Sequence, residues 1–273
     1  MIAYEHVAVR YPGADRDAVR DVSFAAARGR LTAIVGPNGS GKSTLVRALL
    51  GRQPLASGRI TIDGRDLAAF SRADIARRIA VVTQREELAF PTAVQEYIAL
   101  GRFPHRGSWR GAVAADREAI EHAVALAGVG ALLDRNVDTL SGGEWQRARI
   151  ARALAQGGDA IVLDEPTTYL DVAHEMEAFE LLSQLARAGM AVLLVSHQLN
   201  LVARFADLLV LLHDGSVAAS GAPDAVMRGE ILERVYGWPL VVTRDPAVGA
   251  PALVPLRGRA RAASLPTLPP TGP

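Results

Sequence analysis

One glycine-rich segment of the sequence has the residue types and spacing needed to hold phosphate groups. The run Gly36-Pro37-Asn38-Gly39-Ser40-Gly41-Lys42-Ser43-Thr44 matches the pattern G-x-x-x-x-G-K-[ST]. Its glycines let the backbone wrap closely and aim several N–H groups at a phosphate, and the N-terminus of a following helix adds a partial positive charge. Lys42 supplies a full charge toward the β- and γ-phosphates, and the Ser43 hydroxyl can ligate magnesium. The segment predicts nucleotide binding in preference to a simple glycine-rich turn before a helix.

Four polar side chains follow apolar runs that read as strands, namely Gln84, Asp164, Glu165 and His197. Asp164 can hold the magnesium shell, while Glu165 can polarise an attacking water. Gln84 can reach magnesium or the same water, and His197 can contact the γ-phosphate. A single histidine after a strand is more often structural, but strand ends beside the phosphate loop would bring all four side chains to one edge of a sheet. The set predicts nucleotide hydrolysis there.

The elements that position these residues alternate between short β-type runs and helical patterns, as expected of an α/β fold with a largely parallel sheet. The expected strands are Ala3–Arg10, Val22–Ala26, Leu31–Val35, Arg59–Ile62, Ile79–Thr83, Ala160–Leu163, Ala191–Val195, Leu208–Leu212 and, after a hairpin turn, Val217–Ser220. The expected helices are Ser43–Leu50, Thr92–Gly101, Ala114–Ala127 and a helix from Ser141 to about Ala155.

The alternation of strands and helices is interrupted by residues 85–140, which we interpret as a helical insertion between core segments 1–84 and 141–242. Pro91, Pro104 and Gly107–Gly111 punctuate this insertion. Residues 243–273 form a C-terminal tail rich in proline, glycine and arginine. We expect this tail to be poorly ordered from about Pro246 onward, with Arg257, Arg259 and Arg261 in solvent.

The run Leu140-Ser141-Gly142-Gly143-Glu144-Trp145-Gln146-Arg147 offers a second anion site at a helix start. Taken alone, Ser141–Glu144 is explained equally well as a capped helix. The run, however, resembles the signature of the ABC ATPase family. Gly36–Thr44, Gln84, the Asp164-Glu165 pair and His197 fall in that family's order and spacing. The resemblance extends to about Val242.

The resemblance implies a P-loop NTPase core over residues 1–242, with a RecA-like mixed sheet, an N-terminal antiparallel β subdomain and a small helical subdomain. It implies a head-to-tail homodimer in which ATP and Mg²⁺, bound at Gly36–Thr44 of one copy, are closed off by Ser141–Glu144 of the other. Glu165 would be the general base, helped by His197 and Gln84, and the magnesium ligands would be Ser43, Gln84 and Asp164. Asp171 would lie at the dimer contact. Tyr11 would stack on adenine, although an aromatic on an early strand also suits core packing.

Four further segments resemble the ATPases of importers for iron complexes and cobalamin. They are Phe90–His105, Thr167–Asp171, His197-Gln198-Leu199-Asn200 and Asp245–Pro251. This resemblance implies a bacterial import ATPase that couples MgATP-driven dimer closure to uptake of heme or a ferric siderophore, with cobalamin as the alternative. A separate polytopic permease in two copies would carry the solute, and a periplasmic or extracytoplasmic solute-binding protein would be an indirect partner. Exporters commonly fuse the ATPase to its membrane domain, so a separate ATPase favours import.

The permease is expected to insert a short cytoplasmic helix into a groove formed by the stretch after Gln84. Six side chains are available to line the groove, although most also suit packing within the helical insertion: Ala89, Phe90, Tyr97, Leu100, Phe103 and Trp109.

Composition limits the remaining classes of function. The 273 residues contain no cysteine, which excludes disulfides and cysteine-ligated zinc. Their net charge of +1 argues against binding along a nucleic acid. The apolar runs are far shorter than the roughly 20 residues that span a bilayer. We therefore expect a soluble protein, bound peripherally at the cytoplasmic face of the inner membrane by its partner. The rival classes are a non-transport ABC ATPase acting on DNA or ribosomes, which usually has a long coiled coil or fused domains, and a small-molecule kinase, which would leave Ser141–Glu144 unexplained.

Overall fold

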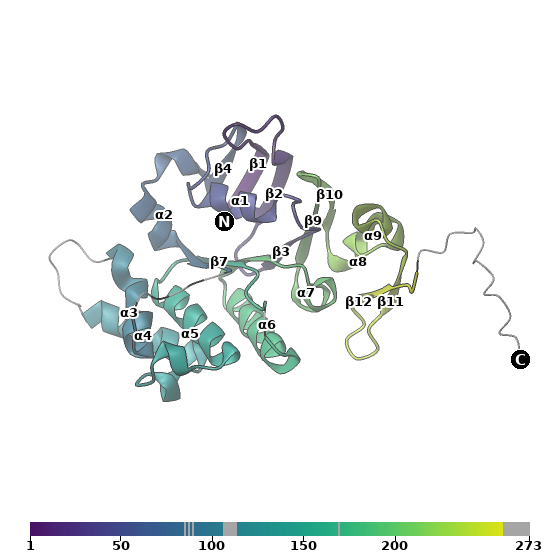
Figure 1. Ribbon diagram of the computed structural model, residues 1–273. Coiled ribbons are helices and arrows are strands. Elements are labelled where there is room, and N and C mark those ends of the chain that lie inside the picture. Colours follow the sequence, from purple (N-terminus) through teal and green to yellow (C-terminus); the bar gives the residue numbers. More distant parts are fainter. Residues whose placement is uncertain (85, 87, 89, 106–113, 169, 259–273) are drawn as a thin grey trace, which may run out of the picture.

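A central sheet carries the residues predicted to act on phosphate. The computed structural model describes residues 1–84, 86, 88, 90–105, 114–168 and 170–258 (Figure 1). Within these residues a six-stranded sheet has the order β10-β9-β3-β8-β7-β6. Its strands are β3 (Leu31–Val35), β6 (Ile79–Val82), β7 (Ala160–Asp164), β8 (Ala191–Val195), β9 (Leu208–His213) and β10 (Ser216–Gly221). Neighbouring strands pair in parallel, except that β10 runs antiparallel beside β9.

A second, antiparallel sheet lies over one face of the central sheet and has the order β2-β1-β4-β5. Its strands are β1 (Ile2–Val9), β2 (Val19–Ala26), β4 (Ser57–Ile62) and β5 (Arg65–Asp66). The helices are α1 (Lys42–Leu49), α2 (Arg72–Arg78), α3 (Val94–Ala99), α4 (Ala114–Ala127), α5 (Gly142–Ala155), α6 (Val172–Arg187), α7 (Leu199–Phe205), α8 (Pro223–Val226) and α9 (Gly229–Tyr236). Short 3₁₀ helices span Leu67–Ala69, Leu100–His105, Gly130–Leu132 and Val137–Thr139.

The central strands are continuous apolar runs because both faces of their sheet are covered. Every residue of β3 and β8 is buried. Since successive side chains of a strand point to opposite faces, the two cores alternate along β3. Leu31 and Val35 belong to the core that includes Phe179 of α6, whereas Ile34 belongs to the core that includes Leu45 of α1.

The predicted insertion contributes α3 and α4, which pack with α5 as a helical lobe (Figure 1). Its core contains Val94, Tyr97 and Ile98 of α3 together with Ala123 of α4 and Ala148 of α5. The predicted fold class, a mixed sheet with an antiparallel β subdomain and a small helical subdomain, is confirmed. Element ends differ slightly from the predicted ones, the largest shift being at β2, which begins at Val19 and not at Val22. The expected helix Thr92–Gly101 is α3 followed by a 3₁₀ helix.

The structure differs from the sequence-based expectation in the C-terminal tail. Strand β11 (Leu240–Arg244) pairs antiparallel with β12 (Pro251–Pro255), so the chain is ordered well past Pro246. Prolines stand at both ends of β12. They are tolerated because a residue at the end of a strand or on an edge strand need not donate an N–H to the ladder, and proline has none to donate. The expectation for Arg259, Arg261 and the last residues lies outside the described residues, as do Ala89, Gly107–Gly111 and Trp109.

None of the helices in the described ranges is long and apolar enough to cross a membrane.

Candidate nucleotide site

The glycine-rich loop connects the end of β3 to the start of α1, as the sequence predicted. Gly36 has a φ of +145°, and a Cβ added there would lie 2.2 Å from the carbonyl oxygen of Leu212. Gly41 has a φ of +101°, and a Cβ there would lie 2.8 Å from the carbonyl oxygen of Ala18. Both the backbone conformation and the close approach of neighbouring chain therefore require glycine at these two positions.

The polar groups of this loop suit an anionic ligand. Gly41 occupies the N-cap of α1 and brings no side chain to accept from the first-turn N–H groups, which remain available for phosphate oxygens. The buried Ser40 hydroxyl has no hydrogen-bond partner among the described residues. Lys42 Nζ donates to the carbonyl oxygens of Gly36 and Pro37, each at 2.9 Å, so the ammonium lies inside the loop. Burial lowers the pKa of Lys42, and the charges of Glu165 and Asp164 oppose that effect.

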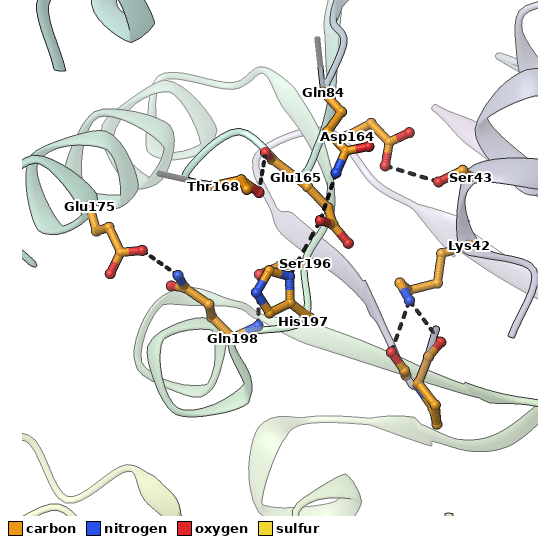
Figure 2. Close-up of polar contacts among 12 residues, drawn as sticks. Lys42, Ser43, Gln84, Asp164, Glu165, Thr168, Glu175, Ser196, His197 and Gln198 are labelled. Carbon is orange, nitrogen blue, oxygen red and sulfur yellow. Dashed lines mark hydrogen bonds and ion pairs between the residues drawn. The ribbon is translucent and has the colours of Figure 1, made fainter. Parts of the chain in front are cut away.

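A hydroxyl and a carboxylate meet beside the loop in the arrangement that a hard divalent cation requires. Ser43 Oγ donates to Asp164 Oδ1 at 3.3 Å (Figure 2). Burial raises the pKa of the Asp164 carboxyl, while the Ser43 hydrogen bond opposes this rise. A bound cation would stabilise the ionised carboxylate in this half-buried position. The residues present therefore fit Mg²⁺, which prefers oxygen ligands.

Glu165 is the point at which the other predicted side chains converge. Gln84 Nε2 donates to Glu165 Oε2 at 3.1 Å, and His197 Nδ1 lies 3.4 Å from the same oxygen (Figure 2). These residues come from the ends of β6, β7 and β8, so the predicted convergence at one edge of the sheet is observed. The Glu165 backbone is left-handed, with a φ of +49°, a conformation that costs about 1 kcal/mol for a residue with a side chain. It is held by a bond from Glu165 N to the carbonyl oxygen of Val195 at 2.9 Å.

Tyr11 lies at the mouth of the same site, just beyond the end of β1. It lines a cleft of about 490 Å³ together with Ala18, residues 38–44, Gln84 and Glu165. Its hydroxyl lies 3.1 Å from Thr44 Oγ1 and accepts a hydrogen bond from Arg47 Nη1 at 3.1 Å. The ring is therefore fixed at the cleft, where an adenine can stack on it, and does not belong to the buried core of β1. Sequence reasoning missed Arg47, although its place one turn after Thr44 on α1 was a usable signal.

The signature segment forms a capped helix start, and among the described residues it is not part of this cleft. The Ser141 hydroxyl accepts from Glu144 N at 3.3 Å, and the Glu144 carboxylate accepts from Ser141 N at 2.8 Å, so the two residues make a capping box. Arg135 Nη1 also donates to Glu144, at 2.9 Å. Ser141 and Gly142 are exposed. In the described part of the chain, the lining of the phosphate cleft includes none of Ser141–Glu144.

Asp171, the predicted dimer contact, is exposed and caps α6 through its carboxylate, which accepts from His174 N at 3.0 Å. This hydrogen bond lowers the pKa of Asp171. The His174 ring, with Nδ1 2.7 Å from Asp171 Oδ1, lies directly against Gly143: a Cβ added at Gly143 would be 2.0 Å from His174 Cδ2. Position 143 therefore has no room for a side chain, because α6 packs on the signature helix there. The sequence alone did not reveal this reason.

The comparisons with known proteins agree with this geometry. Residues 19–168 match the ABC transporter family. The chain is 42% identical over 229 residues to the ferric enterobactin transport ATP-binding protein FepC of Escherichia coli (strain K12), covering 84% of each chain. It is also 42% identical over 247 residues to the hemin import ATP-binding protein HmuV of Nocardia farcinica, covering 90% of this chain and 84% of that protein.

Two further matches broaden the comparison. The cobalamin import ATP-binding protein BtuD of Halobacterium salinarum is 39% identical over 245 residues, which cover 89% of this chain and 61% of that protein. A solved structure of an inward-facing, metal-chelate type ABC transporter superposes with a TM-score of 0.82 at 27% identity, covering 94% of this chain and 97% of the other.

The chain belongs to the ABC transporter family, as an ATP-binding subunit. It is an ATPase whose hydrolysis is coupled to transport, and its cofactors are ATP and Mg²⁺. The resemblance stated from the sequence is confirmed.

The contact between His174 and Gly143 predicts that substitutions at these two positions compensate each other. Gly143 is helical, and the three atoms nearest to the Cβ of Gly143→Ala all belong to the His174 ring, so we expect this clash to lower the free energy of unfolding by about 1–3 kcal/mol. In a His174→Ala background the same change should cost less than about 0.5 kcal/mol, because alanine favours a helix once the ring is gone. Denaturant unfolding of the four proteins measures this coupling.

Gly229→Ala is the matched control for that cycle. Gly229 begins α9, and no heavy atom of the described structure lies within 4 Å of a Cβ added there. An equal cost of Gly143→Ala with and without the His174 ring would show that the ring is not what excludes a side chain at Gly143.

Proposed function

We propose that the protein is the ATP-binding and ATP-hydrolysing subunit of a bacterial ABC importer for an iron complex, heme or a ferric siderophore, with cobalamin as the alternative. The convergence of Gln84 and His197 on Glu165, beside the Lys42 loop, carries the enzymatic part of this proposal. The proposed solute rests on similarity to relatives. FepC, named for ferric enterobactin, and the Nocardia farcinica HmuV, named for hemin, are each 42% identical to the chain, and the cobalamin protein is 39% identical.

Each side chain of the site has a proposed role that its geometry supports. Glu165 is the general base that accepts a proton from the attacking water. Among the described residues, its contacts to Gln84 and His197 both use Oε2, which leaves Oε1 to accept that proton. Gln84 orients the water, and His197 is placed to donate to the γ-phosphate. ATP would supply the γ-phosphoryl group that the water attacks, with ADP as the leaving group, and Ser43, Asp164 and Gln84 would hold Mg²⁺.

A second copy of the chain is proposed to complete the site. Among the described residues, the exposed Ser141 and Gly142 at the start of α5 do not line their own protomer's nucleotide cleft, so they are available to meet the nucleotide of another copy. A head-to-tail homodimer brings these groups together and places the exposed Asp171 at the seam. The ATPase domain is proposed to span residues 1–242, followed by the C-terminal tail.

The permease is proposed to dock beside Gln84, in a groove of about 940 Å³ between α2, the end of β6 and the 3₁₀ helix Leu100–His105. Leu100 and Phe103 line it and are 52% and 77% exposed, and Phe90 is 78% exposed nearby in sequence. Tyr97 is excluded as a docking residue, because it is fully buried and packs on Trp145 with ring centroids 4.7 Å apart. Two permease copies would hold the dimer at the cytoplasmic face of the inner membrane, with a solute-binding protein on the far side.

The proposed general base predicts the behaviour of Glu165→Gln. Glutamine keeps the size and hydrogen-bonding length of the side chain but cannot accept a proton, so kcat should fall at least about 100-fold. The affinity for MgATP should stay within about threefold, because the cradle is unchanged, and the protein should persist as a dimer in MgATP. Steady-state ATPase assays, nucleotide titration and light scattering measure these three quantities.

Glu180→Gln is the matched control, since it removes an exposed carboxylate on α6. Glu165→Gln protein that stays monomeric in MgATP and keeps full hydrolysis would contradict the proposed role.

The proposed solute class predicts the result of a transport assay on the complete complex. With labelled heme, ferric siderophore and cobalamin offered in parallel to membrane vesicles, we expect ATP-dependent uptake of an iron complex that Glu165→Gln abolishes. Uptake of cobalamin alone would select the alternative. Uptake of only an unrelated solute would overturn the solute class while leaving the ATPase site intact.

A further inference from the structure

Two sequence segments that the catalytic site does not use lie against each other in the fold. They are the segment that follows His197, which forms α7, and the C-terminal hairpin formed by β11 and β12 (Figure 1). Asn200 Nδ2 donates to the carbonyl oxygen of Leu253 at 3.1 Å, and Leu253 N donates to Asn200 Oδ1 at 2.7 Å. Arg204, one turn further along α7, forms an ion pair with Asp245 in the turn of the hairpin.

The Asn200 side-chain amide pairs with the outer edge of β12 in the way that the backbone of a neighbouring strand would. Both backbone groups of Leu253 bond to one side-chain amide, so they point away from β11 and form the outer edge of β12. An exposed strand edge presents unpaired N–H and C=O groups, and the primary amide satisfies one of each. The contact therefore fixes α7 in register along β12, which a purely apolar contact does not do.

Helix α7 depends on such outside contacts for its position. It has only seven residues, a length at which a helix has little stability of its own. Its N-cap, Gln198, has no side-chain cap within the described structure. Leu199 and Val202 are buried against the sheet, which holds the helix to the core. The contacts that restrain its opposite flanks are the Gln198–Glu175 hydrogen bond on the α6 side and the Asn200–Leu253 pair on the hairpin side.

The hairpin is itself anchored to the core, so it can hold α7 in place. Leu240 is buried in the main core, and Val242 and Leu253 pack against that core. The Asp245 carboxylate accepts from the backbone N–H groups of Ala247 and Val248, at 2.9 Å and 3.3 Å, which closes the turn.

The residue that this arrangement controls is His197, one helical turn before Asn200. Its side chain is 53% exposed, and its 3.4 Å approach to Glu165 is too long to hold the ring by itself. The ring position therefore follows from the backbone, where Leu199 N donates to the carbonyl oxygen of His197 at 3.1 Å and Gln198 N donates to Ser196 Oγ at 3.1 Å. These bonds join His197 to the start of α7.

We propose that the C-terminal hairpin is a positioning element for His197, acting through the paired hydrogen bonds between Asn200 and Leu253. The inference rests on the proposed role of His197 and extends the functional unit past Val242 into the tail. Among the described residues, neither Asn200 nor the hairpin lines the nucleotide cleft. They set where the histidine side chain meets Glu165 and the γ-phosphate.

The test compares kcat and KM for MgATP in the full-length chain. Asn200→Ala removes both bonds, and Leu253→Pro removes the outward N–H while leaving the ladder to β11, because the Leu253 N–H is not part of that ladder. We expect each to lower kcat about tenfold with KM within about twofold, since misplacing a reacting group by about 1 Å can cost about 100-fold. In a His197→Ala background, Asn200→Ala should lower the residual single-turnover rate no further.

Arg244→Ala is the matched control on the same hairpin, because Arg244 bonds to Gly249 and pairs with Asp224 of α8, away from α7. It should leave kcat within about twofold, a change of about 0.4 kcal/mol in activation free energy. Denaturant unfolding of every variant shows whether a lost rate reflects lost fold.

The outcomes separate this inference from the role of His197. Unchanged kcat in both Asn200→Ala and Leu253→Pro overturns the inference alone, and so does an equal loss from Asn200→Ala with and without the His197 ring. A wild-type kcat in His197→Ala overturns the proposed role of the histidine, and the inference falls with it.

Discussion

The site depends on the parallel pairing of four strands, which forces their carboxyl ends to one edge of the sheet. In the observed register Ile34 of β3 lies beside Val195 of β8, Val195 beside Asp164 of β7, and Leu163 of β7 beside Val82 of β6. Because each strand ends within a few residues of these pairs, the phosphate loop, the acidic pair, Gln84 and His197 must emerge next to one another. A slip of one residue in any pair would turn its side chains to the opposite face.

Two parts of the molecule meet at that edge: the strand ends of the central sheet and the helical lobe. The strand ends carry the phosphate loop, Gln84, Glu165 and His197, whereas the signature residues Ser141–Glu144 begin α5 in the helical lobe and are not among the described residues that line the cleft. The lobe is joined to β6 directly after Gln84. Arg149 and Arg152 of the signature helix donate to the carbonyl oxygens of Thr83 and Val81 at the end of that strand. These hydrogen bonds tie the signature helix to the strand end that precedes Gln84, the residue that bonds Glu165.

Much of this was accessible from the sequence because it is encoded locally. The glycine-rich loop, the apolar strands with polar ends and the serine-capped helix each carry their signal within about ten residues, whereas the order of the strands in the sheet was not predicted. The hairpin of β11 and β12 was missed, because its proline-rich composition resembles that of disordered tails, while Leu240, Val242 and Leu253 pack it on the main core. The contact of His174 with Gly143 was inaccessible, since it depends on which surfaces of α5 and α6 meet, whereas packing within the helical lobe was already one of the two interpretations of Tyr97.

A structure of the Glu165→Gln protein trapped with MgATP is the most direct test of the shared site. Two copies should be related by a two-fold axis, with each nucleotide between the Lys42 loop of one copy and the signature helix of the other. The Ser141 hydroxyl or the N–H groups beside it should lie roughly 3 Å from a γ-phosphate oxygen bound by the opposite protomer. If Ser141 is remote from every phosphate in every assembly observed, each protomer binds its nucleotide without the other, and the proposed closing dimer is wrong.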